Sequence, residues 1–271
     1  MGSNHLADMT NKPGAMQMIE VGEGAARRRI AYRFDAGDTA RPTIVWLGGL
    51  RSDMQSTKAS ALAEHCATRA LPYLRFDYSG HGASEGTFAQ GTMSRWLEEA
   101  LAIVTRVAPG PLALVGSSLG GYVTLLLARA LGALGQAERL RGMVLIAPAV
   151  DMTERLMWAA FPEAVKARIL GEGRWDLPSA YGLEPTPITR GLIEDGRGHL
   201  LLGAPIRTFC PTIVLQGADD PDVPLAHTLE TMKFFASDPV TLMIVADGDH
   251  RLSRPQDIAL LCDALDRVYP P

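Results

Sequence analysis

The stretch LALVGSSLGGY, residues 112–122, indicates how this chain folds. An apolar run leads into Gly116-Ser117-Ser118-Leu119-Gly120, and a segment compatible with a helix follows. This is G-x-S-x-G between a predicted strand and a predicted helix, a turn so sharp that its central residue adopts strained backbone angles. Glycines at 116 and 120 remove side chains that would clash there. The motif predicts that Ser118 stands exposed as a nucleophile. The alternative is a serine that caps a helix after an ordinary tight turn.

The composition is that of a soluble globular protein. The chain has 271 residues, of which 47% are hydrophobic and 21% charged, and its net charge is −4. This length fits one large α/β domain or two small ones. Binding to nucleic acid needs a clustered basic face. The one basic run, Arg27-Arg28-Arg29, opens a predicted strand and is expected at a solvated edge. We therefore expect no nucleic-acid partner.

Cysteine usage and hydropathy bear on location. Cys66, Cys210 and Cys262 are widely spaced, which favours a reducing compartment and offers no metal-ligand spacing. No apolar run reaches the roughly 18–20 residues of a membrane span, and the start of the chain lacks an apolar signal core. We expect a cytoplasmic protein without stable membrane insertion. Residues 1–14 are polar and unpatterned, and are expected to form a disordered or cloning-derived tail.

Strand and helix patterns alternate along most of the chain. Apolar strand-like runs occur at residues 16–21, 28–34, 43–47, 72–76, 112–115, 142–147, 211–215 and 240–246. Helical segments are predicted at residues 54–70, 92–107, from 122 onward, 224–236 and 255–268. Alternating continuous strands and helices predict an α/β fold, with a mostly parallel sheet flanked by helices.

The pattern breaks down between residues 149 and 206. Pieces that carry tryptophan or phenylalanine alternate there with prolines and glycines. We predict a helical lid inserted over the strand ends. Residues 15–148 and 207–271 would then form the core, and residues 149–206 the lid.

A serine nucleophile needs a base within hydrogen-bond reach and a carboxylate that orients this base. Of the six histidines, His250 alone lies in a loop after a late strand and beyond every carboxylate candidate. Asp219, Asp220 and Asp222 share the preceding loop. Asp220 is favoured because of its position three residues after Gly217. Asp219 and Asp222 are expected to form turns or cap a helix.

The negative charge that develops on a substrate carbonyl needs two preorganised N–H donors. One is expected to be the backbone N–H of Leu119, directly after the nucleophile. The other is expected in the loop Leu47-Gly48-Gly49-Leu50, where glycines let the backbone approach a substrate closely. We assign it to the N–H of Leu50, with that of Gly49 as the alternative.

With these residues in place, the chain resembles the α/β-hydrolase superfamily of serine hydrolases, whose nucleophile elbow is the G-x-S-x-G turn. More narrowly, it is similar to abhydrolase domain-containing acyl-thioesterases and acyl-glucuronide esterases. The resemblance extends over residues 43–268 and rests on these segments: 52–54, 57–59, 75–80, 115–121, 175–181, 199–206, 210–211, 217–224 and 249–251.

The resemblance implies that Ser118, Asp220 and His250 form a catalytic triad. It also implies hydrolysis of acyl esters or thioesters, on small molecules or on proteins, without a cofactor or a metal. Two positions depart from the pattern of relatives. Gln216 stands where many have histidine, and Gly48 stands where many lipases have histidine. Neither change removes a member of the triad.

Five residues are candidates for binding substrate. Trp158, Trp175 and Tyr181, together with Phe161, are placed to wall an acyl pocket, or else simply pack the lid onto the core. Arg51, beside the oxyanion loop, is placed to meet an anionic substrate, or else pairs with a nearby carboxylate such as Asp53.

Two other functions fit the same sequence. A carbon–carbon bond hydrolase of this fold uses the same triad on vinylogous diketones. A non-catalytic binding protein would keep the fold, although an intact serine, aspartate and histidine set argues against it. Dehalogenases and epoxide hydrolases need aspartate where Ser118 stands.

Overall fold

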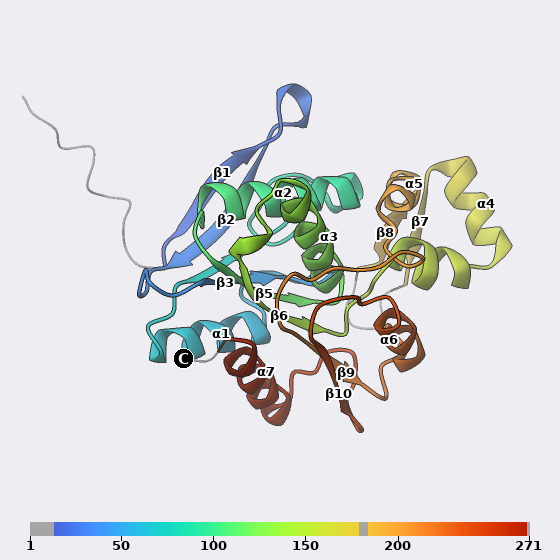
Figure 1. The fold of residues 1–271 in the computed structure, drawn as a ribbon. Helices are drawn as coiled ribbons and strands as arrows, with labels where there is room; N and C mark the ends of the chain where they lie inside the picture. The colour runs from blue at the N-terminus through green and yellow to red at the C-terminus, as the bar shows by residue number, and fades with distance from the viewer. Residues whose placement is uncertain (1–13, 179–183, 270–271) are drawn as a thin grey trace, which may run out of the picture.

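An eight-stranded sheet with helices on both faces forms the framework (Figure 1). The computed structural model describes residues 14–178 and 184–269. The strands follow the order β1-β2-β4-β3-β5-β6-β9-β10, and only β2 runs antiparallel to its neighbours. Their bounds are β1 (Met16–Val21), β2 (Arg28–Asp35), β3 (Thr43–Leu47), β4 (Tyr73–Phe76), β5 (Leu112–Ser117), β6 (Leu140–Ile146), β9 (Thr212–Gly217) and β10 (Val240–Val245). The predicted α/β fold is confirmed.

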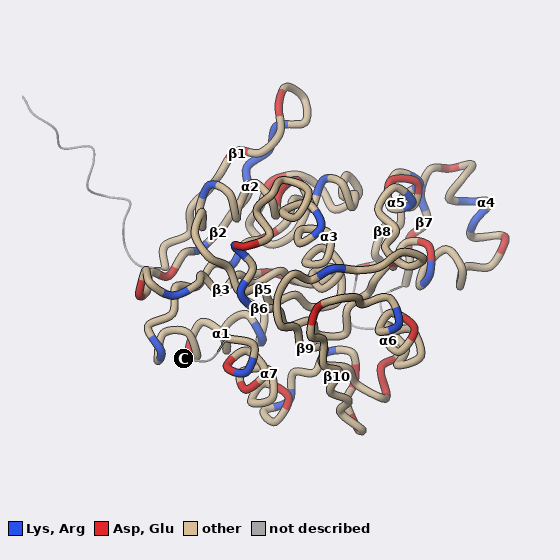
Figure 2. Tube along the Cα trace, in the orientation of Figure 1, with Lys and Arg blue, Asp and Glu red and all other residues tan. Residues whose placement is uncertain are grey.

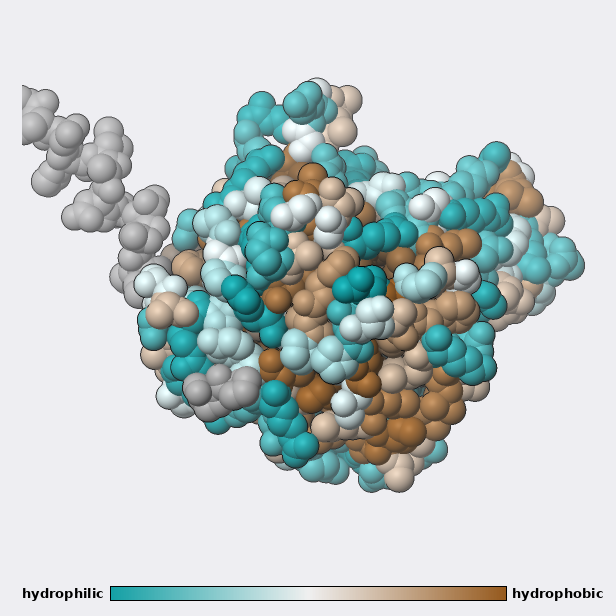
Figure 3. Space-filling model, in the orientation of Figure 1, coloured by the Kyte–Doolittle hydropathy of each residue, from teal (hydrophilic) through white to brown (hydrophobic). Residues whose placement is uncertain are grey.

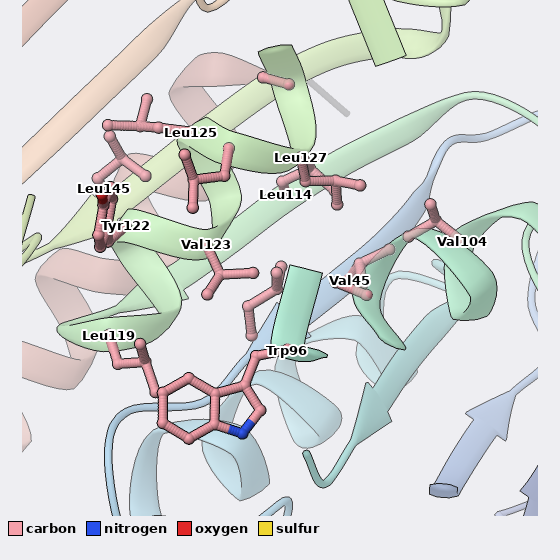
Figure 4. Close-up of a cluster of buried hydrophobic side chains, with 14 of the residues drawn as sticks. Val45, Trp96, Val104, Leu114, Leu119, Tyr122, Val123, Leu125, Leu127 and Leu145 are labelled. Atoms are coloured by element: carbon pink, nitrogen blue, oxygen red, sulfur yellow. The ribbon is translucent and has the colours of Figure 1, made fainter. Parts of the chain in front are cut away.

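Two helical layers bury the two faces of this sheet. One face packs against α1 (Thr57–Thr68) and α7 (Pro255–Val268), and the other against α2 (Met93–Arg106), α3 (Leu119–Ala133) and α6 (Leu225–Met232). Figure 4 shows the second layer, where Trp96 of α2 and Val123 of α3 gather with Val45 and Leu114 of the sheet. The central strands are buried on both faces, which explains their continuous apolar sequences.

The basic run at the start of β2 differs from the expectation of a solvated edge. Arg28 is buried, and its guanidinium pairs with the buried carboxylate of Glu99 on α2 and with Glu98. The second oxygen of Glu99 accepts a hydrogen bond from the backbone N–H of Ser79. A buried charge is tolerated only when it is paired. Arg28, the middle arginine of the run, meets this condition and is part of the core.

The segment between β6 and β9 is only partly helical, which corrects the prediction of a helical lid. It contains a π-helical turn (Thr153–Met157), a 3-10 turn (Trp158–Ala160), α4 (Glu163–Glu172), β7 (Arg174–Leu177), β8 (Thr186–Thr189) and α5 (Arg190–Gly196). The strands β7 and β8 pair as an antiparallel two-stranded sheet. Pro187 fits there because a two-stranded sheet consists only of edge strands. Figure 1 shows α4, β7, β8 and α5 together at one side of the molecule.

Charge and hydropathy describe the surface of the described residues. Figure 2 shows basic and acidic positions interleaved along the trace in this view. Among residues 14–178 and 184–269, no helix is both long enough and apolar enough to cross a membrane. Apolar surface is visible over the region of α6 and β10 (Figure 3), elements that carry the exposed side chains of Leu229 and Ile244.

Candidate active site

The turn between β5 and α3 holds Ser118 in a strained conformation. Its backbone angles are φ 55° and ψ −117°, a region that residues with a side chain rarely adopt. A Cβ atom on Gly116 would lie 2.3 Å from the Thr124 hydroxyl oxygen and 2.4 Å from the Gly120 carbonyl oxygen. The glycine that precedes the serine is therefore required by close packing, as the motif predicts.

The structure brings Ser118, His250 and Asp220 into one hydrogen-bonded chain. His250 Nε2 lies 3.0 Å from Ser118 Oγ, and His250 Nδ1 lies 2.8 Å from Asp220 Oδ2. The three residues follow β5, β10 and β9, parallel strands whose carboxyl ends meet at one edge of the sheet. The Asp220 side chain is fully buried and that of His250 is mostly buried. This is the geometry in which a histidine can take a proton from a serine hydroxyl.

The carboxylate of Asp220 is held on both oxygens. Its Oδ1 accepts hydrogen bonds from the backbone N–H of Asp222 at 2.9 Å and of Val223 at 2.8 Å. Asp219, its neighbour in the sequence, is exposed, and its backbone N–H donates to Gly248. Asp249 accepts from the N–H groups of Arg251 and Leu252, so it shapes the turn after His250. Asp220, the favoured carboxylate, thus lies 2.8 Å from His250 Nδ1.

The loop that carries His250 is tied to α1. Lys58 Nζ donates hydrogen bonds to the backbone oxygen of Arg251 and, at 3.3 Å, to Ser253 Oγ. Burial lowers the pKa of Lys58 to about 8, against the opposing effect of Asp249. Sequence reasoning did not assign Lys58 a role, because the two segments are far apart along the chain.

Gln216, treated in the sequence only as a departure from relatives, belongs to the site. It is the penultimate residue of β9 and is fully buried. Its amide nitrogen lies 3.2 Å from Asp220 Oδ2. The same oxygen lies within hydrogen-bond distance of His250 Nδ1. A polar residue near the end of an otherwise apolar strand was the available signal for this contact.

The loop after β3 lies directly against the serine. A Cβ atom on Gly49 would lie 3.3 Å from the backbone oxygen of Ser117 and 3.5 Å from Ser118 Cβ. The next residue in that loop is Leu50, and Leu119 begins α3 on the other side of Ser118. Within residues 14–178 and 184–269, neither the Leu50 nor the Leu119 amide donates a backbone hydrogen bond. Both N–H groups are thus free of competing backbone acceptors beside the serine.

Arg51 pairs differently from the expected Asp53. It has a positive φ of 60°, and its guanidinium lies 3.8 Å from the carboxylate of Glu184 and 5.4 Å from the centre of the Phe88 ring. Asp53 instead accepts a hydrogen bond from the backbone N–H of Gln55. The expected pair of Arg51 with Asp53 is therefore wrong. The partner of Arg51 belongs to a segment that is remote in the sequence. A polar hollow of about 200 Å³, lined by residues 51–53 and 80–82, lies alongside.

The predicted aromatic residues pack within the inserted segment. Trp175 meets the Phe161 ring edge to face at 5.3 Å. Trp158 lies between Arg197, 5.1 Å from its ring centre, and Lys166, 5.7 Å away. These rings surround a small apolar cluster formed by Ile169, Ile188 and Ile193. Tyr181 lies outside the described residues.

One cluster has the composition of a metal site. Asp220, Asp222 and His250 each offer one ligand atom within 4.8 Å of the others. Both oxygens of Asp220 already accept hydrogen bonds, and both ring nitrogens of His250 lie within hydrogen-bond distance of protein atoms. The Asp220 oxygens and the His250 ring nitrogens are therefore engaged in hydrogen bonds within the protein.

Comparison with known proteins shows the family of this chain. Residues 44–260 match the alpha/beta hydrolase family. A mouse protein named palmitoyl-protein thioesterase ABHD10, mitochondrial, is 35% identical over 240 residues, covering 88% of this chain and 77% of the relative. The human protein of that name is 32% identical over 238 residues, covering 88% of this chain and 75% of the relative. These names do not support the predicted cytoplasmic location.

Solved structures extend the agreement to the whole fold. A structure of an Agrobacterium vitis S4 protein, classed there as a hydrolase, superposes with a TM-score of 0.92 at 44% identity, covering 95% of this chain and 99% of that one. The mouse alpha/beta hydrolase domain-containing protein 10 superposes with a TM-score of 0.81 at 33% identity, covering 93% of this chain and 98% of that one. The chain belongs to the alpha/beta hydrolase family.

Proposed function

We propose that this protein hydrolyses carboxylic esters and thioesters through an acyl-enzyme formed on Ser118. The observation that carries the proposal is the continuous chain from Ser118 Oγ through His250 to the buried carboxylate of Asp220. The curated relatives are named as palmitoyl-protein thioesterases, which supports a thioester as one substrate. The acyl group would be carried by a small molecule or by a protein.

The first step transfers the acyl group to the enzyme. His250 Nε2 accepts the hydroxyl proton as Ser118 Oγ attacks the carbonyl carbon. The oxyanion is stabilised by the N–H groups of Leu50 and Leu119, which flank the serine and have no backbone acceptor of their own in the described chain. Asp220 holds the imidazole in the required tautomer. The leaving alcohol or thiol takes the proton from His250.

The second step returns the free enzyme. Water enters where the leaving group departed, and His250 takes its proton while the water oxygen attacks the acyl carbon. As the bond between Ser118 Oγ and the acyl carbon breaks, Oγ takes the proton back from His250 Nε2, and the carboxylic acid leaves. The two backbone amides and the triad are sufficient for both steps without a metal or cofactor.

Arg51 is proposed as the group that meets an anionic part of the substrate. It lines the polar hollow beside the proposed oxyanion loop, and its side chain is exposed. Its present partner is the well-exposed Glu184 at 3.8 Å, a long and weak ion pair that a substrate anion can displace. Arg51→Ala should reduce kcat/KM more for an anionic ester than for its neutral counterpart. An equal loss for both would contradict this role.

The aromatic residues Trp158 and Trp175 carry a weaker case for substrate binding. Their contacts are with Phe161, Lys166 and Arg197 of the same inserted segment. We propose that they shape the acyl pocket indirectly, by holding the segment that covers the strand ends.

The experiment that tests the proposed function compares paired oxygen esters and thioesters, from acetyl to palmitoyl, with the wild type and Ser118→Ala. The neighbouring Ser117→Ala is the matched control, since Ser117 is buried in β5. We expect Ser118→Ala alone to lose at least about 10³-fold in kcat. Labelling by a fluorophosphonate separates a hydrolase from a binding protein. Activity only on a vinylogous diketone would indicate the carbon–carbon hydrolase instead.

A further inference from the structure

The hydrogen-bonded chain of Ser118, His250 and Asp220 continues from Asp220 to Gln216. Gln216 Nε2 lies 3.0 Å from the backbone oxygens of Gly217 and of Val223, and 3.2 Å from Asp220 Oδ2. All of these contacts lie within the loop that carries the aspartate. The two hydrogens of this amide are shared among three acceptors, two backbone oxygens and, at the longest distance, the carboxylate of Asp220.

A second buried side chain fixes which way the amide points. Thr228 of α6 donates its hydroxyl hydrogen to Gln216 Oε1 at 2.7 Å, and both residues are completely buried. The reversed amide would place Oε1 against three oxygen acceptors, a repulsive arrangement. The three acceptors therefore direct the N–H groups of Gln216 toward Asp220, and the hydroxyl of Thr228 holds the amide oxygen on the opposite side.

We propose that Gln216, oriented by Thr228, is a positioning residue that sets the pH range in which His250 acts as a base. The inference rests on the proposed function. Hydrogen bonds connect five residues in one chain, which runs from Thr228 through Gln216, Asp220 and His250 to Ser118.

The direction of the effect follows from the shared oxygen. An N–H donated by Gln216 stabilises the negative charge on Asp220 Oδ2, so less of that charge remains to stabilise a protonated His250. Without the donor, Asp220 and His250 both hold a proton more readily. A protonated His250 cannot act as a base, so the acid limb of the activity profile would move to higher pH.

The test removes each link separately. Gln216→Met keeps the length of the side chain without a donor, and Thr228→Val keeps its shape without a hydroxyl. Thr228→Ser retains a hydroxyl at this position. Thr231→Val is the matched control, because Thr231 is equally buried on α6 and donates only to the backbone of its own helix, at His227. Each variant is compared with the wild type by its kcat/KM profile against pH and by its melting temperature.

We expect the acid limb to move up by about half to one pH unit in Gln216→Met, since one unit corresponds to the energy of one modest hydrogen bond. A smaller shift is expected in Thr228→Val, and none in Thr228→Ser or Thr231→Val. A merely structural role would lower the melting temperature and the rate without moving the profile. Unshifted profiles in folded Gln216→Met and Thr228→Val would overturn the inference.

A second readout keeps the inference separate from the proposed function. The ring nitrogens of ¹⁵N-labelled His250 report protonation directly by NMR, whatever the substrate. A titration displaced upward in Gln216→Met and Thr228→Val supports the inference even if the wild type hydrolyses none of the esters. Active wild type with an undisplaced titration would leave the proposed function standing and reject the role of Gln216.

Discussion

The backbone oxygen of Leu47 would lie only 2.0 Å from a Cβ atom placed on Gly120. Leu47 ends β3 just before the proposed oxyanion loop, and Gly120 lies in the first turn of α3 just after Ser118. The nucleophile turn and the oxyanion loop are therefore packed backbone against backbone. Close packing at Gly120 therefore helps to place the Leu50 loop beside Ser118.

Gly120→Ala should therefore disrupt the site although alanine favours helices. Alanine in a helix normally stabilises by about 1 kcal/mol relative to glycine, but here the obstructing atoms are backbone and cannot move aside. We expect a destabilisation of about 3 kcal/mol or more and a loss of activity of at least about 100-fold. Chemical denaturation and ester hydrolysis measure the two effects.

The control for this change is Gly171→Ala in α4, where a new Cβ atom meets nothing within 4 Å. That variant should be as stable as the wild type or slightly more stable. If both glycine variants behaved alike, close packing at Gly120 would not be the reason for its glycine.

Asp220→Asn should abolish most activity and leave the fold in place. An amide can present its NH₂ group to His250 Nδ1 and so favour the wrong tautomer, an effect that costs about 10⁴-fold in a well-studied serine protease. Asp219→Asn tests the alternative carboxylate of the same loop, and should retain near wild-type activity because Asp219 is exposed. The reverse ranking in kcat would assign the orienting role to Asp219.

Trp175→Ala should loosen the inserted segment rather than alter substrate binding directly. The indole is lost from its contact with Phe161 and from the small cluster around Ile188. We expect amide hydrogen exchange in α4, β7 and β8 to accelerate about tenfold or more, since partial loss of an aromatic contact costs on the order of 1–2 kcal/mol. Unchanged exchange with a raised KM for long acyl chains would instead place Trp175 in the pocket wall.

Much of the fold could be predicted from local patterns. The strands of the parallel sheet are buried on both faces, so each appears as an unbroken apolar run in the sequence. The turn at Ser118 could also be predicted, because only glycine fits at positions 116 and 120. A Cβ atom there would collide with Thr124 or with Leu47. The choice of Ser118, Asp220 and His250 depended on more than local patterns, because it also used the resemblance to α/β-hydrolases.

The features that could not be predicted all join distant segments. Arg28 and Glu99 are 71 positions apart, and the burial of their ion pair depends on how α2 lies across β2. The pairing of β7 with β8, and the contact of Arg51 with Glu184, depend on the path of the inserted segment. Gln216 and Thr228 are closer, but their hydrogen bond appears only when α6 packs against β9. Local spacing contains no information on these contacts.

The last prediction concerns stability in acid and rests on His81. Its ring is buried among Tyr78, Phe88 and Trp96, with ring centres 5.2–6.0 Å apart. Burial lowers the pKa of His81 to about 4, although its contact with the backbone oxygen of Ser79 opposes the shift. The folded protein therefore keeps His81 neutral at pH values where the unfolded chain already binds a proton.

Because the unfolded state binds the proton near pH 6.5 and the folded state only near pH 4, stability is lost as the pH falls through this interval. From pH 7 to pH 5, His81 alone should account for about 2 kcal/mol of lost stability. His81→Phe keeps an aromatic ring in place and removes the titrating group. Denaturant unfolding at both pH values should show a drop about 2 kcal/mol smaller in the variant than in the wild type. The partly buried histidines His199 and His227 titrate in both proteins and cancel in this comparison. Equal drops in the two proteins would mean that His81 takes up its proton as readily in the fold as outside it.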